Sequence, residues 1–296
     1  MNDAFVRYHP FVIFLYFTVV LAYCICFMHP LFLMISLFCA FMWAFCLNKK
    51  QFVRFCLAYI LPFMCISVLF NIAFNHAGAT ILTYLPDGNP LTLESIIYGG
   101  AAAMLLAAVV TWFSCFNQIM TADKFVYLFG KIMPSLSLVL ALALRFVPKF
   151  KAQMKTVQNA QRCLGRSVSS GTVWQRVCNA AKILSIMVTW ALEDAIETAD
   201  SMKSRGYGLS GRTAFSIYRF DRRDRVALFF ICTVGLYILC TIFQGSLYFR
   251  YFPFVRLGDF TVWSGTAIVA YFGLCMLPIG INRWEDRKWT RIKSNI

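Results

Sequence analysis

A basic side chain at the end of a predicted helix is the strongest candidate for chemistry in this chain. The stretch 187–209 reads MVTWALEDAIETADSMKSRGYGL and closes its helical pattern at Ser204, Arg205 and Gly206. Glycine favours the left-handed conformation that ends a helix, so Arg205 is expected to project from the helix terminus. There its guanidinium can bind a carboxylate of a partner through two parallel hydrogen bonds.

One face of the same helix is built from small side chains. Ala195, Ala199 and Met202 recur at helical spacing, whereas the acidic residues Glu193 and Glu197 lie on another face. Small residues let a partner helix approach closely. We therefore expect this face to be buried, either against a second helix of the chain or against a partner.

A second glycine-ended helix precedes the first in the sequence. The segment from about Leu144 to Gly165 predicts an amphipathic helix, with apolar residues near one face and lysines on others. Gly165 ends this helix, and Arg162 and Arg166 flank the end. The acidic helix begins near Thr172, and the sequence leaves open whether it bends. Two helices that end in glycine, each beside arginine, form a repeated device.

The sequence carries no recognisable motif for catalysis or metal binding. Its three histidines lie on different loops or helix ends, and its twelve cysteines are scattered without a Cys-x-x-Cys pair. It contains no Walker loop, no glycine-rich dinucleotide turn and no nucleophile elbow. The sequence therefore predicts no catalytic residue, no metal site and no cofactor.

The elements that must position these helix ends lie in a membrane. The chain is 60% hydrophobic and only 14% charged, whereas a soluble domain is about a quarter charged. The net charge of +15 would indicate a nucleic-acid partner in a soluble protein. Here it fits cytoplasmic loops enriched in Lys and Arg. We expect a multi-pass protein of the plasma membrane that contacts the lipid bilayer and no nucleic acid.

Six apolar stretches are long enough to cross a bilayer, which takes roughly 20 residues. They are residues 11–28, 31–47, 52–73, 96–116, 226–243 and 261–281. A seventh stretch, 134–147, is short and ends near Arg145 and Pro148. The segment 117–148 is therefore expected to hold a half-span, a tilted span or an amphipathic interfacial helix.

Loop charges set the expected orientation. Residues 149–225 hold 14 Lys and Arg against 6 Asp and Glu, and the tail after residue 281 is also basic, so both are placed inside. Residues 75–94 carry no Lys or Arg and are placed outside. Both termini are then cytoplasmic, and segment 117–148 must cross zero or two times. Arg250 and Arg256, in the last outer loop, are the one misfit.

The predicted fold is all-α: a polytopic membrane protein with about six transmembrane helices and long amphipathic cytoplasmic helices. Residues 1–148 form an N-terminal transmembrane bundle, 149–225 the cytoplasmic helical region, and 226–296 a transmembrane hairpin with a basic tail. The spans contain almost no ionisable residue near their centres. This argues against a self-sufficient ion-driven carrier, which needs such groups.

The chain resembles the transmembrane T component of energy-coupling factor (ECF) transporters, which are ATP-driven importers of vitamins and metals. Residues 144–148, LRFVP, resemble the start of the family's first coupling helix. Residues 160–165, AQRCLG, and 199–207, ADSMKSRGY, occupy its two short coupling motifs. Segments 76–80 and 84–90 are typical of one branch of the family. The chain departs from the pattern at Leu164, where the first motif has arginine.

The resemblance implies a coupling subunit that is not itself an enzyme. Two cytoplasmic ABC ATPases would bind the ends of the two coupling helices, and ATP hydrolysis would take place on them. Their motion would pass to a separate, small substrate-binding (S) subunit, packed against Ala195, Ala199 and Met202. The residues assigned to ATPase coupling are Arg162, Gly165, Arg166, Ser204, Arg205 and Gly206. The transported vitamin or metal, and the identity of the two ATPases, are not encoded in this sequence.

Two other functions compete with this one. The permease subunit of a conventional ABC transporter would need polar residues along a central path, and the spans contain few. An intramembrane enzyme would need a catalytic dyad within a span, and none is visible. Co-purification of a separate small membrane subunit would favour the coupling subunit over the permease.

Overall fold

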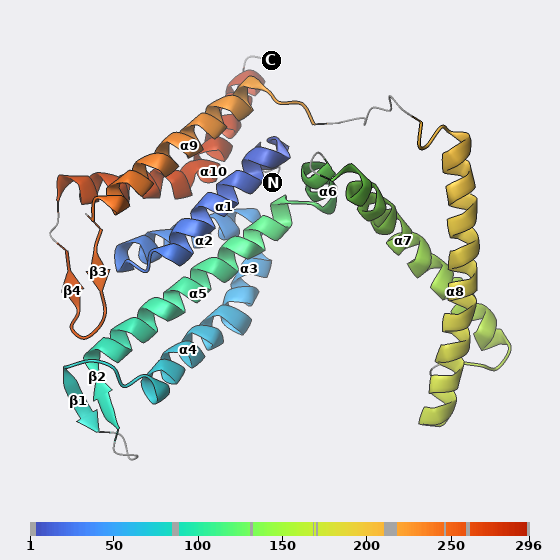
Figure 1. Ribbon diagram of the computed structural model, residues 1–296, viewed down its shortest axis with the longest axis horizontal. Helices are drawn as coiled ribbons and strands as arrows, with labels where there is room; N and C mark the ends of the chain where they lie inside the picture. Colours follow the sequence, from blue (N-terminus) through green and yellow to red (C-terminus); the bar gives the residue numbers. More distant parts are fainter. Residues whose placement is uncertain are drawn as a thin grey trace. The chain divides into compact units, whose positions relative to one another are not determined.

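The computed structural model describes residues 4–84, 89–130, 133–167, 169, 171–209, 218–245, 247–258 and 261–294. Helices dominate these residues, and two short two-stranded sheets accompany them (Figure 1). The predicted all-α, polytopic membrane fold is confirmed. The chain forms two compact units: Met1–Thr121 together with Tyr218–Ile296, and Ala122–Ile217.

The first unit holds the apolar helices. In chain order its helical elements are the 3-10 helix η1 (Ala4–Arg7), α1 (Pro10–Cys26), α2 (Pro30–Leu47), α3 (Lys49–Phe55), the π-helical turn η2 (Cys56–Ile60), α4 (Leu61–Phe74), α5 (Leu93–Ile119), α9 (Arg222–Phe243) and α10 (Val262–Ser294). Five stretches of helix are long and apolar enough to cross a bilayer: α2, the continuous run α3–η2–α4, α5, α9 and most of α10. With 17 residues, α1 is a shorter apolar helix, at the lower end of the about 17–25 residues of a span. Each predicted span therefore corresponds to a helix.

Local sequence explains where these helices begin. Pro10 and Pro30 are the first residues of α1 and α2. The fixed φ of proline suits a helix, and an N–H at the first helical position would have no acceptor within the helix, so its absence costs nothing. Thr92 caps α5, because its Oγ1 accepts a hydrogen bond from the Ser95 amide at 3.3 Å. The helix boundaries thus follow from residues at the boundaries themselves.

Large aromatic side chains form the core of the first unit. Trp43 and Trp112 are fully buried, with ring centroids 5.7 Å apart, and Phe17 stacks on Trp43 at 5.4 Å. The buried indole N–H of Trp112 donates to Ser36 Oγ at 2.9 Å, so its polar group is satisfied inside the helix bundle. This core joins α1, α2 and α5.

A buried carboxylate organises the loop between α4 and α5. Glu94 accepts a hydrogen bond from Thr80 Oγ1 at 2.7 Å, and Gly78 lies against it with φ +141°. A Cβ on Gly78 would lie 2.6 Å from Glu94 Oε2, so only glycine fits. Segment 76–80 therefore has a structural role. In segment 84–90, residues 85–88 lie outside the described residues.

Two short antiparallel hairpins were not anticipated from the sequence. The strand β1 (Ile81–Tyr84) pairs with β2 (Pro90–Thr92), and β3 (Phe249–Arg250) pairs with β4 (Arg256–Leu257). They close the loops before α5 and before α10. The amide of Ala79 donates to the Pro253 carbonyl at 3.1 Å, which ties these two loops together.

The second unit consists of α6 (Ala122–Gly130), α7 (Pro134–Cys163) and α8 (Val173–Ser204). The helix α7, predicted from about residue 144, begins ten residues earlier because the apolar stretch 134–147 and the amphipathic segment form one helix. This helix continues through Pro148, although proline cannot donate the backbone hydrogen bond of its turn. The helix α8 runs from Val173 to Ser204 as one continuous element. The second unit starts at Ala122, whereas the predicted boundary at 149 concerns the side of the membrane and stays a prediction.

Candidate partner interface

The end of α7 is a glycine-closed turn. Gly165 has φ +73°, and its amide donates to the Arg162 carbonyl at 3.0 Å. The amide of Arg166 donates to the carbonyl of Gln161, the residue before Arg162, at 2.9 Å. This pair of hydrogen bonds defines a Schellman motif, which satisfies carbonyls that the helix end would leave without partners.

The end of α8 repeats the same turn. Gly206 has φ +80°, and its amide donates to the Lys203 carbonyl at 3.0 Å. The amide of Tyr207 donates to the Met202 carbonyl, also at 3.0 Å. The repeated device predicted from the glycines is thus a pair of helix ends with the same hydrogen-bonded geometry.

The two ends share a backbone but present different side chains. The residue before the glycine is Leu164 in α7 and Arg205 in α8, with φ of −85° and −87° respectively. Both side chains are exposed. Arg162 occupies the position of Lys203, and Arg166 lies beyond the turn. At Leu164 an apolar side chain therefore replaces a charged one, while the backbone conformation matches that of Arg205.

Among the two arginines at the α7 end, Arg162 lines a cavity. The cavity has a volume of about 270 Å³ and lies beside the loop that leads to α8. Its lining residues are Gln158, Asn159, Arg162, Ser167 and Ser169. Asn179 of α8 donates through Nδ2 to the Ser167 carbonyl at 3.1 Å, which fixes the loop against the helix. The lining is polar with one positive charge, so it suits an anionic side chain.

Bulky apolar residues hold α7 and α8 together where they cross (Figure 1). Val157 of α7 is buried with Ile183 and Met187 of α8. Phe150 and Trp190 pack against this cluster, with ring centroids 5.4 Å apart and nearly perpendicular planes. Edge-to-face aromatic pairs stabilise a contact by more than the burial of their apolar area alone. The α7–α8 hairpin is thus a packed unit.

A charged contact lies beside this cluster. The ammonium of Lys149 pairs with the Asp194 carboxylate and also lies 5.3 Å from the ring centroid of Trp190. The Asp194 side chain is 13% exposed and that of Lys149 is 51% exposed. Asp194 therefore contributes to the contact between α7 and α8.

The predicted small-residue face does not form the contact between the helices. Ala195 and Ala199 are exposed and Met202 is half-buried, because the crossing lies nearer the middle of α8 and bulkier side chains fill it. The expectation that a second helix of the chain covers the two alanines is wrong for the described residues. Burial against a partner stays a prediction.

An apolar stripe runs along α8 away from α7. Its members recur at intervals of three or four residues and are exposed within this chain. They are Val177, Ala181, Leu184, Val188, Leu192, Ala195 and Ala199. We call this stripe the uncovered face of α8. A helix that is apolar on a second face needs a second covering surface.

The family of the chain follows from comparison with known proteins. The family model of CbiQ, the cobalt transport protein, matches residues 6–215. The chain belongs to the CbiQ family. Helices α7 and α8 and the turn at the end of each lie within the matched residues.

Relatives of this CbiQ-family chain carry the ECF name. The energy-coupling factor transporter transmembrane protein EcfT of Lactobacillus helveticus is 36% identical over 106 residues, which cover 35% of this chain and 38% of the relative. EcfT of Bacillus selenitireducens is 27% identical over 184 residues, covering 58% and 68%. EcfT 1 of Listeria monocytogenes is 25% identical over 189 residues, covering 59% and 71%. The resemblance to the T component is confirmed.

Two of the relatives are matched over little more than a third of their length. The chain spans 38% of the L. helveticus protein and 35% of the EcfT of Lacticaseibacillus paracasei. The comparisons support a transmembrane component of the ECF type in a multi-pass membrane protein. In the described part of this CbiQ-family chain, no three His, Cys, Asp or Glu side chains gather so that they could hold a metal ion.

Sequence reasoning missed the residues that hold the hairpin. Ile183 and Met187 are its buried members on α8, and they lie on a different face from Ala195. Both sets follow helical spacing, so one helix carries two apolar faces in its sequence. The periodicity signal was present for both, but it does not say which face meets α7.

Proposed function

We propose that this CbiQ-family protein is the coupling subunit of an ECF importer. It transmits the ATP-driven motion of two cytoplasmic ABC ATPases to a separate S subunit in the membrane, for uptake of a vitamin or a metal. The observation that carries the proposal is the pair of identical glycine-closed turns at the ends of α7 and α8. Each turn presents a helix end with arginine on it or beside it, as a docking point for one ATPase.

The hairpin separates the two docking points. α8 has 32 residues, which span about 48 Å at 1.5 Å per residue. The α7 turn joins the loop that leads into the start of α8, whereas the other turn closes its far end. Two partner domains can therefore engage one hairpin at the same time, each at its own end.

Because the helices are packed where they cross, the hairpin can move as one rigid unit. Val157, Ile183 and Met187 are buried where the helices meet, and close-packed interiors transmit displacement with little deformation. When the ATPases move the two helix ends, the hairpin turns as a unit and its uncovered face moves with it. The S subunit packs on that face, since an apolar stripe that ends in small residues fits a membrane helix.

Arg205 is the residue to test. Removal of one partner of a buried, hydrogen-bonded charge pair costs about 2–5 kcal/mol of association. Arg205→Ala is therefore expected to insert normally but to lose ATPase recovery on affinity purification and vitamin or metal uptake in reconstituted vesicles. Lys203→Ala, which removes an equal charge from the same turn, is the matched control and is expected to change little.

Two outcomes decide the proposal. Loss of ATPase recovery in Arg205→Ala alone supports a specific contact at the helix end. Full uptake and full ATPase recovery in that variant, at an unchanged level in the membrane, would remove Arg205 from the coupling machinery and with it the main support for two ATPase docking points.

A further inference from the structure

The extension of α10 beyond its apolar part carries a basic face. The helix continues to Ser294, beyond its apolar part, through the sequence RWEDRKWTRIKS that begins at residue 283. Arg283, Arg287 and Arg291 follow one another at intervals of four residues, so they form a ridge along the helix. Trp284 and Lys288 lie beside the ridge. All five side chains are exposed, and we call them the basic face.

Trp284, the aromatic residue of this face, lies next to one of its cations. The ammonium of Lys288 lies 5.3 Å from the ring centroid of Trp284, and the indole is 59% exposed. Tryptophan is enriched where a membrane meets water, because its ring is apolar and its N–H is polar. A tryptophan next to a cation on an exposed helix face therefore fits the headgroup region of a bilayer.

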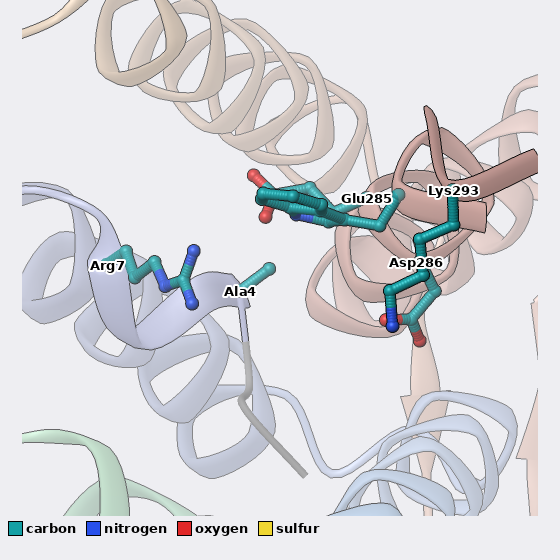
Figure 2. A pocket seen from close by; sticks show the side chains of 6 residues that line it. Ala4, Arg7, Glu285, Asp286 and Lys293 are labelled. Atoms are coloured by element: carbon teal, nitrogen blue, oxygen red, sulfur yellow. The ribbon is translucent and has the colours of Figure 1, made fainter. Parts of the chain in front are cut away.

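Glu285 of the same segment lies on the side of the helix opposite to the ridge. Glu285 pairs with Arg223 of α9 at 3.0 Å, and Asp286 faces a cavity of about 320 Å³ next to η1. Figure 2 shows Ala4 and Arg7 of η1 on one side of this cavity and Glu285, Asp286 and Lys293 of α10 on the other. The Glu285 carboxylate is thus separated from the arginine ridge, whereas Asp286 lies at its edge, three positions after Arg283.

The cavity side is held by specific hydrogen bonds. Asn282 Oδ1 accepts from the amides of Ala4 at 2.8 Å and Phe5 at 3.3 Å. These bonds fix η1 on the cavity side of α10 and so determine which side of the helix is covered by the chain. The basic face is left on the exposed side.

We propose that the basic face binds the phosphate groups of anionic phospholipids in the leaflet next to it. Topology alone requires only that Lys and Arg be numerous on the inner side. It does not require three arginines on one ridge, a tryptophan beside them, or the pairing of Glu285 with α9 on the other side of the helix. A cluster of four to eight basic residues directly after a transmembrane helix, by contrast, is the pattern that binds anionic lipid.

The reach of the side chains fits this occupant. Arg283 follows the apolar residue Ile281 by two positions and Arg291 by ten, so the ridge begins about 3 Å and ends about 15 Å beyond Ile281 along the helix. The polar headgroup region adds roughly 5–8 Å on each side of a bilayer. Long arginine side chains can bend back toward it, so all three guanidinium groups can reach lipid phosphate.

Lipid selectivity tests the proposal. The full chain is reconstituted in phosphatidylcholine bilayers that contain spin-labelled phosphatidylglycerol or spin-labelled phosphatidylcholine, and the relative association constant of the two labelled lipids is measured. The parent protein is expected to prefer phosphatidylglycerol. The triple variant Arg283→Gln, Arg287→Gln and Arg291→Gln is expected to lose that preference by at least about threefold. High salt should weaken the preference of the parent, because these charges are exposed.

Two control variants separate the possible causes. Lys151→Gln, Lys155→Gln and Lys182→Gln removes the same charge from the α7–α8 hairpin and is expected to keep the preference. Replacing the three arginines of the ridge by lysine keeps the charge and is expected to retain most of it, which excludes misfolding as the cause of a loss.

Other outcomes would overturn the assignment. An unchanged preference in the glutamine variant would show that the ridge does not bind lipid. An equal loss in the hairpin control would show a general effect of net charge. The test is independent of the proposed ATPase coupling, since it uses the chain without its partners.

Discussion

At the scale of single residues, the two glycine-closed turns show how one backbone motif can carry two chemistries. Gly165 and Gly206 adopt nearly the same positive φ, and the residue before each has nearly the same conformation. Leu164 and Arg205 therefore stand at equivalent positions. An arginine contact at the α7 end must come from a neighbouring position, and the geometry favours one of the two candidates.

Arg162 is expected to matter more than Arg166 for ATPase recovery. Arg162 lies in the last turn of α7 and lines the polar cavity, whereas Arg166 follows the turn and does not line it. Arg162→Ala should reduce recovery of one ATPase, measured by affinity purification of the co-expressed subunits, and Arg166→Ala should reduce it less. Equal losses of ATPase recovery in the two variants would show that the ATPase recognises the total positive charge at the end of α7. A larger loss in Arg166→Ala would move the contact beyond the turn.

The sequence was informative about these residues because glycine acts locally. A glycine after a helical pattern predicts a left-handed residue whatever the rest of the fold does. Lys149 and Asp194 were different. They pair across 45 positions of sequence, and the register of the crossing decides which lysine meets which carboxylate. Local periodicity does not contain that register.

At the scale of elements, α8 has to satisfy two surfaces at once. One face packs on α7 through Ile183, Met187 and Trp190, and the uncovered face lies elsewhere around the same helix. Sequence reasoning singled out the face of Ala195, Ala199 and Met202, because periodicity does not say which of the two apolar faces meets α7. The structure separates them, since only residues near the crossing can touch α7.

Tryptophan at position 199 separates packing within the chain from packing against a partner. Ala199 is exposed within this chain, so Ala199→Trp should leave the thermal unfolding of the isolated protein unchanged. Overpacking a close contact costs about 1–3 kcal/mol, so recovery of the S subunit by co-purification should fall. Glu197→Trp, on the polar face of the same helix, is the matched control and should assemble normally.

The outcome for position 199 distinguishes two surfaces. If Ala199→Trp assembles and transports like the parent, the S subunit does not pack on this part of α8. If instead Ala199→Trp lowers the stability of the isolated chain, then the alanine is buried by the chain itself in solution, and the uncovered face of α8 would have a partner within the protein.

At the scale of the whole molecule, composition determined the class of protein, and helix lengths restrict how it crosses the membrane. All six predicted spans are helices, because a long apolar run has few other ways to satisfy its backbone in lipid. The short hairpins β1–β2 and β3–β4 escaped notice, since strands of two to four residues leave no periodic signal. They depend on loop closure between helices that the sequence does not place.

Helix lengths favour no crossing between α5 and α9. With nine residues, α6 extends about 13 Å and cannot span a hydrocarbon core of about 30 Å. The apolar part of α7, residues 134–147, covers about 21 Å before the charged residues of the same helix begin. Six spans with both termini inside then agree with the loop charges, which predict a cytoplasmic position for the α7–α8 hairpin.

A protease site inserted at Ser169 tests this topology. Ser169 is exposed in the loop between α7 and α8, so a short cleavable insertion there should leave both helices intact. Protease added to sealed inside-out vesicles should cut the chain, while protease added to sealed right-side-out vesicles should leave it whole. The same insertion at residue 247, in the loop between α9 and α10, should give the opposite result. Cleavage at position 169 from the outside would place the hairpin on the wrong side for cytoplasmic ATPases, and the proposed coupling could not operate.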